Sequence, residues 1–430
     1  MAITIAEQPR ALTLKGQKLI ILASSNMQAQ TGFKYLIEVD DELGNLIAKY
    51  YIPKNPQNRL VFDLSEVIRE DVKVDTTDAT DDEIIHQLPN SLNNFMSTAP
   101  EGCKKYVVNV GEVYGSPLVE YPNLATINVY LVDGYLQLRD GYRKNLTDYI
   151  ANSSSVIGFL TNRQISDENK YSKTNIEINA SEDDFGTLAF WNDSGAIISS
   201  SATNIIYRIY NQSGFVASEN FTIGTTYGGA NPASTTAEDK LIYFGAFPAN
   251  VNQADHPVVN KPSSVSGWTY YTWQLGSPGK SLQLFIVNTP HPCKHSPVQV
   301  AWKNTLGAWD YFRFDARTQR RITSQSKDYR KTIGNYGTAT TEFTFDTFDA
   351  QIVPYHKEAQ LEYVLQSDWL KVVDTELLTN MVKSKNVMMY IDGAWLPIVV
   401  DSGSLSFEKD TISKRLVASV NVKLAQKEVC

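Results

Sequence analysis

The chain has few of the residues on which most enzymes and metalloproteins depend. Its 430 residues include three cysteines (Cys103, Cys293 and Cys430) and five histidines. Three scattered cysteines exclude a disulfide framework and a four-thiolate zinc site, and five histidines are sparse for acid–base catalysis. No apolar run approaches 18 residues, so we expect no membrane span. The N-terminal sequence lacks the basic and apolar pattern of a signal peptide, so we expect a protein made in a reducing cytoplasm.

Signatures of hydrolases, metalloproteases and dinucleotide-binding loops are also missing. The stretch GSPGK, which starts at Gly276, resembles a phosphate-binding loop only in its glycines, because the required spacing and helix start are absent. Three pairs of adjacent carboxylates fall in polar stretches, where we expect solvated turns: Asp40–Asp41, Asp81–Asp82 and Asp183–Asp184. We therefore predict that the protein is not an enzyme and needs no cofactor.

One stretch, HPCKHSP at residues 291–297, deserves weighing as a metal site. In an extended strand His291, Cys293 and His295 would share one face, which suits three metal ligands. No fourth group is evident elsewhere, and the two prolines favour a turn. The sequence predicts a partly exposed turn with an incidental thiol, and no metal.

Aromatic and β-branched residues are abundant. Phe, Trp and Tyr make up 11% of the chain, with 23 tyrosines, and this favours strands over helices. Apolar residues at 42% and charged residues at 20% are close to globular averages, so long disorder is not expected. The net charge of −8 argues against nucleic acid as the partner of the whole surface, although it leaves room for a local basic patch.

Turn signals divide the chain into three predicted domains, at residues 1–120, 121–255 and 256–430. The fold class we expect is mainly β, with immunoglobulin- or fibronectin-like β-sandwich modules and a C-terminal α+β region. The best helix candidate is at residues 367–383, with Ser367 as its cap and Leu370, Leu377, Leu378 and Met381 near helical spacing.

Two stretches predict the same hairpin scheme. In residues 33–54 a Gly44–Asn45 turn separates two strands, and Tyr35, Ile37 and Val39 alternate as one buried face that Leu46, Ala48 and Tyr50 continue. The order strand, polar glycine turn, strand recurs in YRIYNQSGFVASENFTI at residues 207–223. This is a weak internal repeat, and it indicates duplicated sandwich domains.

The stretch WKNTLGAWDYFRFDARTQRR, residues 302–321, combines aromatic residues with arginines. Alternation in WDYFRF predicts a strand with one buried aromatic face. Seven cations lie between residues 313 and 331: Arg313, Arg317, Arg320, Arg321, Lys327, Arg330 and Lys331. They could hold phosphates while the aromatic rings stack bases. Because the chain is acidic, we favour a solvated rim or an intersubunit salt-bridge patch that faces the acidic surface of a neighbouring copy. The predicted interaction residues are Trp302, Trp309, Arg313, Arg317, Arg320, Arg321 and Arg330.

Several motifs resemble those of structural proteins from tailed-phage virions, notably phages of marine bacteria and of Bacteroidetes. The similar segments are FKYLIEV (33–39), GNLIAKYYIPKNPQN (44–58), VFDLSEVIRE (61–70), Gly111-Glu112-x-Tyr114, FLTNR (159–163), Gly245 with Pro248–Asn250, Cys293 through Phe314, and SKNVMMYIDGAWLPIVV (384–400). Together they extend over most of the chain, from about residue 33 to residue 400. The arginine-rich continuation after Phe314 is not part of the family pattern.

The resemblance implies a structural component of a phage tail, neck or baseplate, without catalytic residues. We expect it to assemble as a homo-oligomeric ring or sleeve with other tail proteins, in the host cytoplasm, and to reside in the virion. One alternative is a tail protein that binds a host receptor or surface glycan, with WNDSG (191–195) or WTYYTW (268–273) as a stacking platform. Another is a DNA-contacting protein at the portal or tail lumen, using the cations at 313–331.

Overall fold

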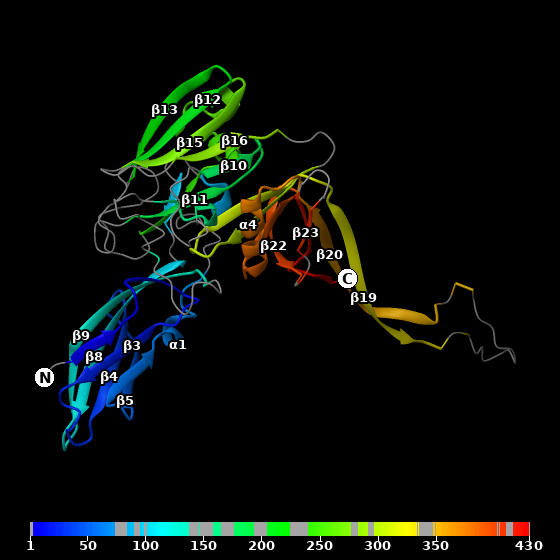
Figure 1. Cartoon of the computed structure of the whole chain (residues 1–430). Helices are drawn as coiled ribbons and strands as arrows, with labels where there is room; N and C mark the ends of the chain where they lie inside the picture. The colour runs from blue at the N-terminus through cyan, green and yellow to red at the C-terminus, as the bar shows by residue number, and fades with distance from the viewer. Residues whose placement is uncertain are drawn as a thin grey trace. The chain divides into compact units, whose positions relative to one another are not determined.

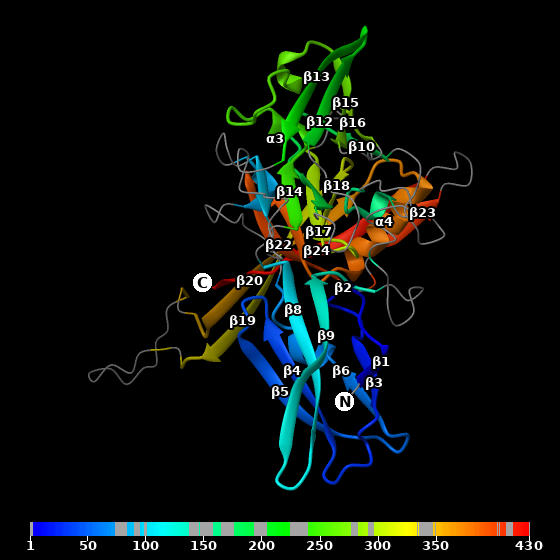
Figure 2. The same cartoon turned by 90° about the vertical axis from the view of Figure 1, so that its left-hand side faces the viewer.

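The chain, described from a computed structural model, is mainly β, as its sequence predicts, with 56% strand and 8% helix. It divides into two compact units, residues 1–290 with 302–311 and residues 291–301 with 312–430. The predicted domain limits at 120 and 255 both lie in the first unit. Figures 1 and 2 show the elements in two views. The structure describes residues 3–73, 84–89, 95–98, 101–136, 146, 158–164, 176–192, 204–223, 240–276, 283–290, 296–332, 334, 347–348, 350–401, 403, 405–409 and 416–429.

The first unit begins with two sheets that share one core. A three-stranded sheet has the order β1-β3-β6, and a five-stranded sheet has the order β2-β9-β8-β4-β5. In Figure 2, β4, β5, β8 and β9 lie side by side. The strands are β1 (Ile3–Glu7), β2 (Leu12–Leu14), β3 (Ile20–Ser25), β4 (Lys34–Asp41), β5 (Leu46–Pro53), β6 (Arg59–Asp63), β8 (Cys103–Tyr114) and β9 (Val119–Val132). The predicted domain limit at residue 120 therefore falls inside β9.

The hairpin predicted around Gly44–Asn45 is formed by β4 and β5. Tyr35, Ile37 and Val39 are fully buried between the two sheets, as alternation requires. The continuation of that buried face into β5 is wrong in part, because Leu46 is 56% exposed and Tyr50 38%. Strand β5 is the last described strand of its sheet, so its outer edge has no described partner strand.

The short helix α1 (Ser65–Ile68) begins two residues after the end of β6, with Leu64 as its N-cap. Asp63 Oδ1 accepts hydrogen bonds from the Ser65 amide at 3.1 Å, the Ser65 hydroxyl at 2.7 Å and the Leu19 amide at 3.2 Å. One carboxylate thus holds the start of the helix and the end of β6 to the segment before β3.

Replacing Asp63 with Ala removes all three bonds, and we expect the free energy of unfolding to fall by about 1–2 kcal/mol, the usual cost of a lost helix cap. Urea denaturation followed by tryptophan fluorescence measures this. Glu66→Ala is the matched control, because Glu66 is an exposed carboxylate on the same helix. Equal stability of the two variants would contradict the capping role of Asp63.

A second five-stranded sheet of the first unit repeats the topology of the first. Its order is β10-β16-β15-β12-β13, and the strands are β10 (Ile176–Ala180), β12 (Asn204–Asn211), β13 (Gly214–Thr222), β15 (Trp268–Gly276) and β16 (Leu284–Asn288). In both sheets the order along the chain is first, fifth, fourth, second, third. The first and fifth strands are parallel and the other pairs antiparallel. The predicted internal repeat is therefore present, with the hairpins β4–β5 and β12–β13 in equivalent positions.

A three-stranded sheet, β11-β14-β7, belongs to the same part of the chain. Its strands are β7 (Met96–Thr98), β11 (Thr187–Trp191) and β14 (Leu241–Gly245), and the short helix α3 (Pro248–Val251) follows β14. Single-turn 3-10 helices are η1 (Ile85–Gln87), η3 (Asn162–Gln164) and η5 (Pro262–Ser264). The rings of Phe244 and Trp273, from β14 and β15, meet with centroids 5.2 Å apart. Aromatic side chains therefore build the core here.

The second unit is built on one large sheet with the path β18-β17-β21-β22-β24-β20-β19, and β23 and β25 pair with β24 and β20. The strands are β17 (Val298–Lys303), β18 (Trp309–Phe314), β19 (Gln319–Arg330), β20 (Ile352–Gln366), β21 (Val387–Ile391), β22 (Ala394–Val400), β23 (Ser406–Lys409), β24 (Leu416–Leu424) and β25 (Glu428–Val429). The chain passes between the two units within β17 and β18.

Helix α4 (Val372–Lys383) confirms the predicted helix but begins five residues later. Its N-cap is Lys371, whose amide donates to Asp374 Oδ2 at 3.0 Å. Ser367 is not the cap, since its amide donates to Ala418 O at 2.9 Å and its hydroxyl accepts from the Ala418 amide at 2.8 Å. Ser367 therefore ends β20 by bonding to β24, a partner that the sequence around it does not reveal.

Candidate functional site

The aromatic half of residues 302–321 lies in the protein interior. Trp302 is fully buried and Trp309 is 3% exposed. Strand β18 forms as predicted, but the prediction of one buried face is wrong, because five of its six residues are buried, Asp310 among them. Two of the predicted interaction residues, Trp302 and Trp309, thus have no surface with which to contact a neighbour.

The buried carboxylate of Asp310 joins two of the motifs described above. Its Oδ1 accepts a hydrogen bond from the Thr161 hydroxyl at 2.5 Å, and its Oδ2 accepts one from the Asn162 amide at 3.0 Å. The Arg163 guanidinium donates to Tyr311 O at 3.2 Å. FLTNR is therefore bound to the strand that contains WDYF, across about 148 residues of sequence. Burial raises the pKa of Asp310 despite these donors.

The turn between β17 and β18 is bonded just as closely. Asn304 Oδ1 accepts from the amides of Leu306 and Ala308, at 2.9 and 3.0 Å, while its side-chain amide donates to Leu160 O at 2.8 Å. Gly307 has a φ of +86°, which L-residues rarely adopt, so the glycine of the motif has a backbone reason. The sequence NTLG is a turn held from within.

A buried histidine contacts the same strand. His86 Nδ1 lies 2.8 Å from the Tyr311 hydroxyl, which also lies 2.9 Å from Thr187 Oγ1. The Asn250 side-chain amide donates to His86 O at 3.0 Å and Leu88 O at 2.6 Å, and Asn250 Oδ1 accepts from the Gly186 amide at 2.7 Å. The Asn of the Gly245…Asn250 motif therefore ties the segment at His86 to α3.

The Gly111-Glu112-x-Tyr114 motif marks a β-bulge in β8. The register of β8 and β9 shifts between Val110 and Glu112. A Cβ on Gly111 would lie 2.5 Å from Tyr121 O, closer than side chains approach, so only glycine fits. Three motifs of the phage-protein resemblance thus have architectural roles in this chain: FLTNR, Gly245 with Asn250, and Gly111-Glu112-x-Tyr114.

Two histidines, His86 and His256, are buried in the first unit. Burial and the charge of Lys303 lower the pKa of His86 to about 3, and burial lowers the pKa of His256 to about 3. Both rings are neutral at physiological pH and, at 0% and 2% exposure, are closed to solvent. Among the described residues no group of three His, Cys, Asp or Glu side chains could hold a metal ion. His291, Cys293 and His295 lie outside the described residues.

The arginines divide into one buried residue and several exposed ones. Arg313 is 8% exposed, and its Nε lies 2.5 Å from Asp315 Oδ1. Arg313 is therefore buried and already paired with a residue two positions along the chain. Arg317, Arg320, Arg321 and Arg330 are exposed, so the structure narrows the predicted interaction set to these four residues.

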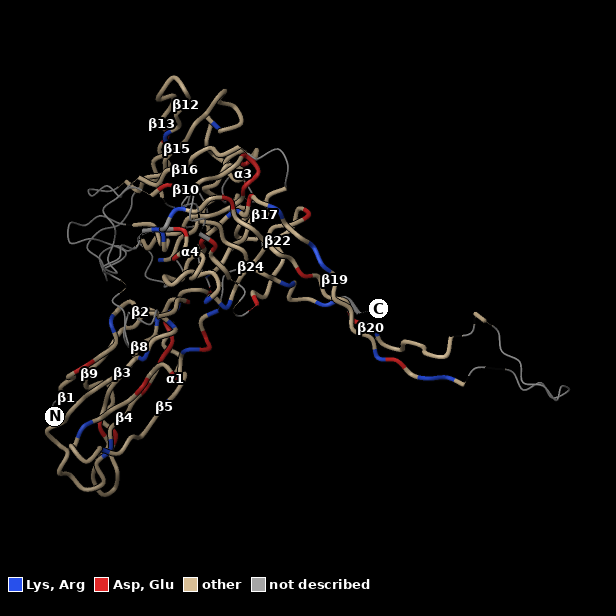
Figure 3. Tube along the Cα trace, turned by 45° about the vertical axis from the view of Figure 1, so that its right-hand side comes forward, with Lys and Arg blue, Asp and Glu red and all other residues tan. Residues whose placement is uncertain are grey.

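The exposed arginines lie on a long two-stranded ribbon. Strands β19 and β20 pair antiparallel from Gln319↔Val364 to Arg330↔Ile352, with a bulge after Lys327. The amide of Lys331 donates to Gln351 O at 3.0 Å, so the pairing continues past β19. We call residues 317–331 and 352–366 the arm, and residues 327–331 and 352–356 its outer half. Figures 1 and 3 show its outer half lying away from the other strands of this unit. The sequence does not predict this ribbon, because QRRITSQSKDYR has no alternating apolar face.

Much of the arm is open to solvent, although Tyr363 and Leu365 on β20, beside β24, are buried. Every residue of β19 from Arg320 onward is exposed. The exposed residues include large apolar side chains, with Ile322 at 66%, Tyr329 at 49%, Ile352 at 55% and Tyr355 at 65% exposure. The Tyr329 and Tyr355 rings lie 6.4 Å apart on the outer half. A monomeric protein seldom exposes such a group of apolar side chains without a partner.

The arm is also cationic. It contains seven Lys and Arg residues and three Asp and Glu residues, which give it a net charge of +4. Since the whole chain has a net charge of −8, the rest of the chain has a net charge of −12. Within the described part of the chain, Arg317, Arg320, Arg321, Lys327 and Arg330 form no salt bridge. Figure 3 shows the cations in blue along both strands.

The aromatic platforms of the carbohydrate-binding alternative are buried. Trp191 and Trp273 are fully buried and Trp268 is 4% exposed. The Trp273 indole donates to Ala246 O at 2.9 Å, as a core residue does. None of the three rings presents a face on which a sugar could stack.

Comparison with protein-family models finds no match for this chain, and comparison with curated proteins finds none either. Among the described residues, no helix is long and apolar enough to cross a membrane.

Proposed function

We propose that this chain is a non-enzymatic structural subunit of a tailed-phage virion, in the tail, neck or baseplate. It assembles with copies of itself as a ring or sleeve and contacts other tail proteins. Assembly takes place in the host cytoplasm, and the assembled protein resides in the virion. The motif resemblance supports the class of protein, and the exposed arm supports assembly as its mechanism.

We further propose that the two repeated parts of the first unit are sandwiches of the immunoglobulin or fibronectin type. In each repeat a first strand runs parallel to the last, and the strand order of the five-stranded sheet is the same. In the first repeat, a three-stranded sheet closes the core on the other side. Sandwiches of this type are common as rigid spacers and interaction modules, which suits a virion subunit. The region with α4 then forms a C-terminal α+β module.

The observation that carries the assembly proposal is the exposure of the arm. A two-stranded ribbon with both faces in water is marginally stable at best, because it buries little apolar surface against its chain entropy. The arm has 12 paired positions and exposed tyrosine and isoleucine side chains. A neighbouring subunit that covers it would supply the missing burial.

Shortening the arm is expected to abolish assembly. The variant replaces residues 327–356 with Asn-Gly, which closes a two-residue hairpin after the Ser326↔Lys357 pair and leaves the β20–β25 contact at Glu358 and Ala359 intact. Mass photometry of the full chain should give a closed multimer, whose ring or sleeve form negative-stain images would show, and the shortened chain should be a monomer.

Circular dichroism checks that the shortened chain keeps its strands, and a virion pull-down checks incorporation. A full chain that stays monomeric at micromolar concentration and recovers no tail protein would overturn the proposed function. A shortened chain that assembles as well as the full chain would show that assembly does not need the arm.

DNA contact at a portal or tail lumen is a second candidate, favoured by the exposed arginines of the arm. In that case binding should be independent of base sequence and weaken steeply with salt. Neutralising Arg317, Arg320 and Arg321 together should reduce the slope of log K against log [salt] by about 3, in a filter-binding or anisotropy titration. An affinity for DNA and a salt slope that these substitutions leave unchanged, or no DNA binding at low salt, would exclude this role.

A further inference from the structure

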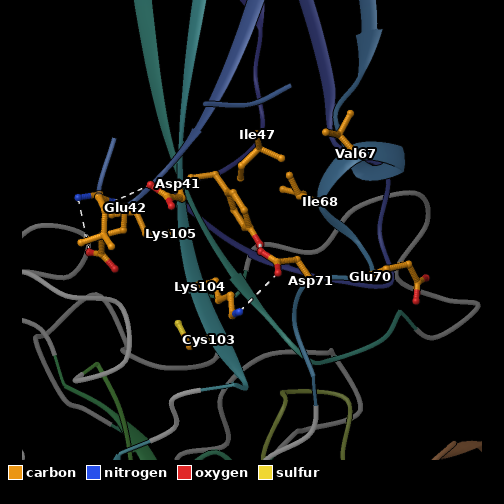
Figure 4. Close-up of a pocket in the computed structure, with 12 residues that line it drawn as sticks. Asp41, Glu42, Ile47, Val67, Ile68, Glu70, Asp71, Cys103, Lys104 and Lys105 are labelled. Atoms are coloured by element: carbon orange, nitrogen blue, oxygen red, sulfur yellow. Dashed lines mark hydrogen bonds and ion pairs between the residues drawn. The ribbon is translucent and has the colours of Figure 1, made fainter. Parts of the chain in front are cut away.

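A hollow lies at the end of the first five-stranded sheet, beside the β4–β5 turn. It has a volume of about 790 Å³, and its wall comes from the β4–β5 hairpin, α1 with the residues after it, and the start of β8. Figure 4 shows Ile47, Val67 and Ile68 on one side of it and Lys104 and Asp71 near its base. The lining residues are Asp41, Glu42, Leu43, Ile47, Val67, Ile68, Glu70, Asp71, Cys103, Lys104, Lys105 and Tyr106.

The wall of the hollow is apolar and exposed on one side. Leu43 is 85% exposed and Ile47 is 44% exposed, both at the tip of the β4–β5 hairpin. They lie next to the free edge of β5, where no described strand follows. Exposed apolar side chains beside an unpaired sheet edge are a common arrangement at protein–protein contacts.

The rim of the hollow is acidic. Four carboxylates line it, against two lysines that are already engaged: Lys105 lies 3.8 Å from Glu42 Oε1, and Lys104 lies 3.5 Å from Asp71 Oδ1. Asp71 Oδ2 also accepts from the Tyr106 hydroxyl at 2.5 Å. Glu70 is exposed and forms no salt bridge among the described residues. The rim can therefore accept cations from outside.

The outer half of the arm has the complementary composition. Its cations are Lys327, Arg330 and Lys331, against the one carboxylate Asp328, and Tyr329, Ile352 and Tyr355 are its exposed apolar side chains. Strand alternation places Lys327 and Tyr329 on one face, so a cation and an aromatic ring are presented together. The hollow offers the matching pair of features, an apolar wall and a carboxylate rim.

We propose that the outer half of the arm of one copy docks in this hollow of a second copy. Tyr329 and Tyr355 pack on the hairpin residues Leu43 and Ile47, and Lys327, on the same face as Tyr329, faces the carboxylates at the rim. The inference rests on the proposed assembly function and specifies the surface that receives the arm. A heterologous contact of this kind, repeated around an axis, closes a ring.

The test is a cross-link between two differently tagged chains. One carries Ile47→Cys and the other Tyr329→Cys, both with Cys293→Ser and Cys430→Ser, while Cys103 stays because it is fully buried. The chains are mixed and treated with a short bismaleimide. Docking predicts a mixed dimer on a denaturing gel, with both tags present, which a contact within one chain cannot produce.

The repeated sheet supplies a matched control. Phe215 is 60% exposed and is the second residue of β13, the strand equivalent to β5, as Ile47 is the second residue of β5. A chain with Phe215→Cys should cross-link to Tyr329→Cys at least tenfold less. Equal yields at the two positions would overturn the docking site.

Charge reversal tests the rim independently. Glu70→Lys should raise the protein concentration at half-assembly by about tenfold, and combining it with Lys327→Glu should restore at least part of the loss. Glu66→Lys on α1 makes the same charge change away from the hollow and should leave assembly unchanged. An equal effect of both glutamate variants, or no restoration, would count against the rim contact.

The outcomes separate the two proposals. Multimers that form normally while the Ile47–Tyr329 cross-link is absent would leave the proposed function standing and refute this docking surface. Full chains that never form multimers would refute both, and cross-linking would then be absent at every position.

Discussion

Between pH 8 and pH 5 the first unit is expected to lose about 4 kcal/mol of its free energy of unfolding, through two buried histidines. His86 and His256 have folded-state pKa values of about 3, against about 6.5 in an unfolded chain. Between these values the unfolded state binds more protons than the folded state, so stability falls as pH falls. The contribution of the two histidines to the free energy of unfolding is fully present above about pH 6.5 and is fully lost near pH 3.

The hydrogen bonds explain why neither ring accepts a proton. The Val258 amide donates to His256 Nδ1 at 3.3 Å, so the neutral ring bears its proton on Nε2, which lies 3.1 Å from Gly245 O. A second proton on Nδ1 would face a donor in a fully enclosed site. At His86 the burial and the nearby Lys303 ammonium both oppose a second charge.

Urea titrations of tryptophan fluorescence at several pH values measure the effect, because Trp191, Trp273, Trp302 and Trp309 are buried in the first unit. His86→Gln and His256→Gln should each lower stability at pH 8 and reduce the pH slope by about one proton. His356→Gln is the control, since His356 is partly exposed beside Glu358 in the second unit. A change below about 1 kcal/mol between pH 8 and pH 5 would contradict the prediction.

Loss of the buried Asp310 carboxylate, which is 3% exposed, is expected to cost about 3–5 kcal/mol of unfolding free energy. Asp310→Ala leaves the Thr161 hydroxyl and the Asn162 amide without their acceptor in a buried site. It also removes the negative charge that interacts with Arg163. Unpaired buried donors lose their full desolvation free energy, and this explains the size of the expected effect.

A graded series separates the bonds from the bulk of the side chain. Asp310→Asn keeps the shape and one acceptor oxygen, so its cost should be about 1–2 kcal/mol. A double-mutant cycle with Thr161→Val should give a coupling energy of about 1–3 kcal/mol. Asp255→Ala, at an exposed aspartate of the same unit, should stay within about 0.5 kcal/mol of the parent. Additive effects of Asp310 and Thr161 would contradict the network.

Elements with a strong local signal were predictable from the sequence. The hairpins β4–β5 and β12–β13 combine alternating side chains with a short polar turn containing glycine, and both factors act within about 20 residues of chain. The end of α4 at Lys383 agrees with the predicted helix, because helical spacing of apolar residues is also a local signal. The predicted start at Ser367 is wrong, because Ser367 bonds to Ala418, about 51 residues away, and no local pattern reveals that bond.

The exposure of the predicted interaction residues was predictable in part. The cation run after Phe314 is visible in the sequence, and four of its arginines are exposed as an interaction site requires. The sequence did not reveal that Arg313 pairs with Asp315 inside the protein, or that Trp302 and Trp309 are core residues. Which face of a strand is covered depends on what packs against it, and both faces of β18 are largely buried.

Composition and local pattern by themselves determined that this is a mainly β chain with repeated hairpins and one long helix near residue 380, because backbone preference and side-chain alternation are local properties. Only the tertiary structure decided the roles of the motifs. Asp310 meets Thr161, and His86 meets Tyr311, through contacts across 149 and 225 residues, and β19 is exposed from Arg320 onward because, among the described strands of its unit, it pairs with β20 alone. Such contacts are set by the packing of whole sheets, which no short stretch of sequence specifies.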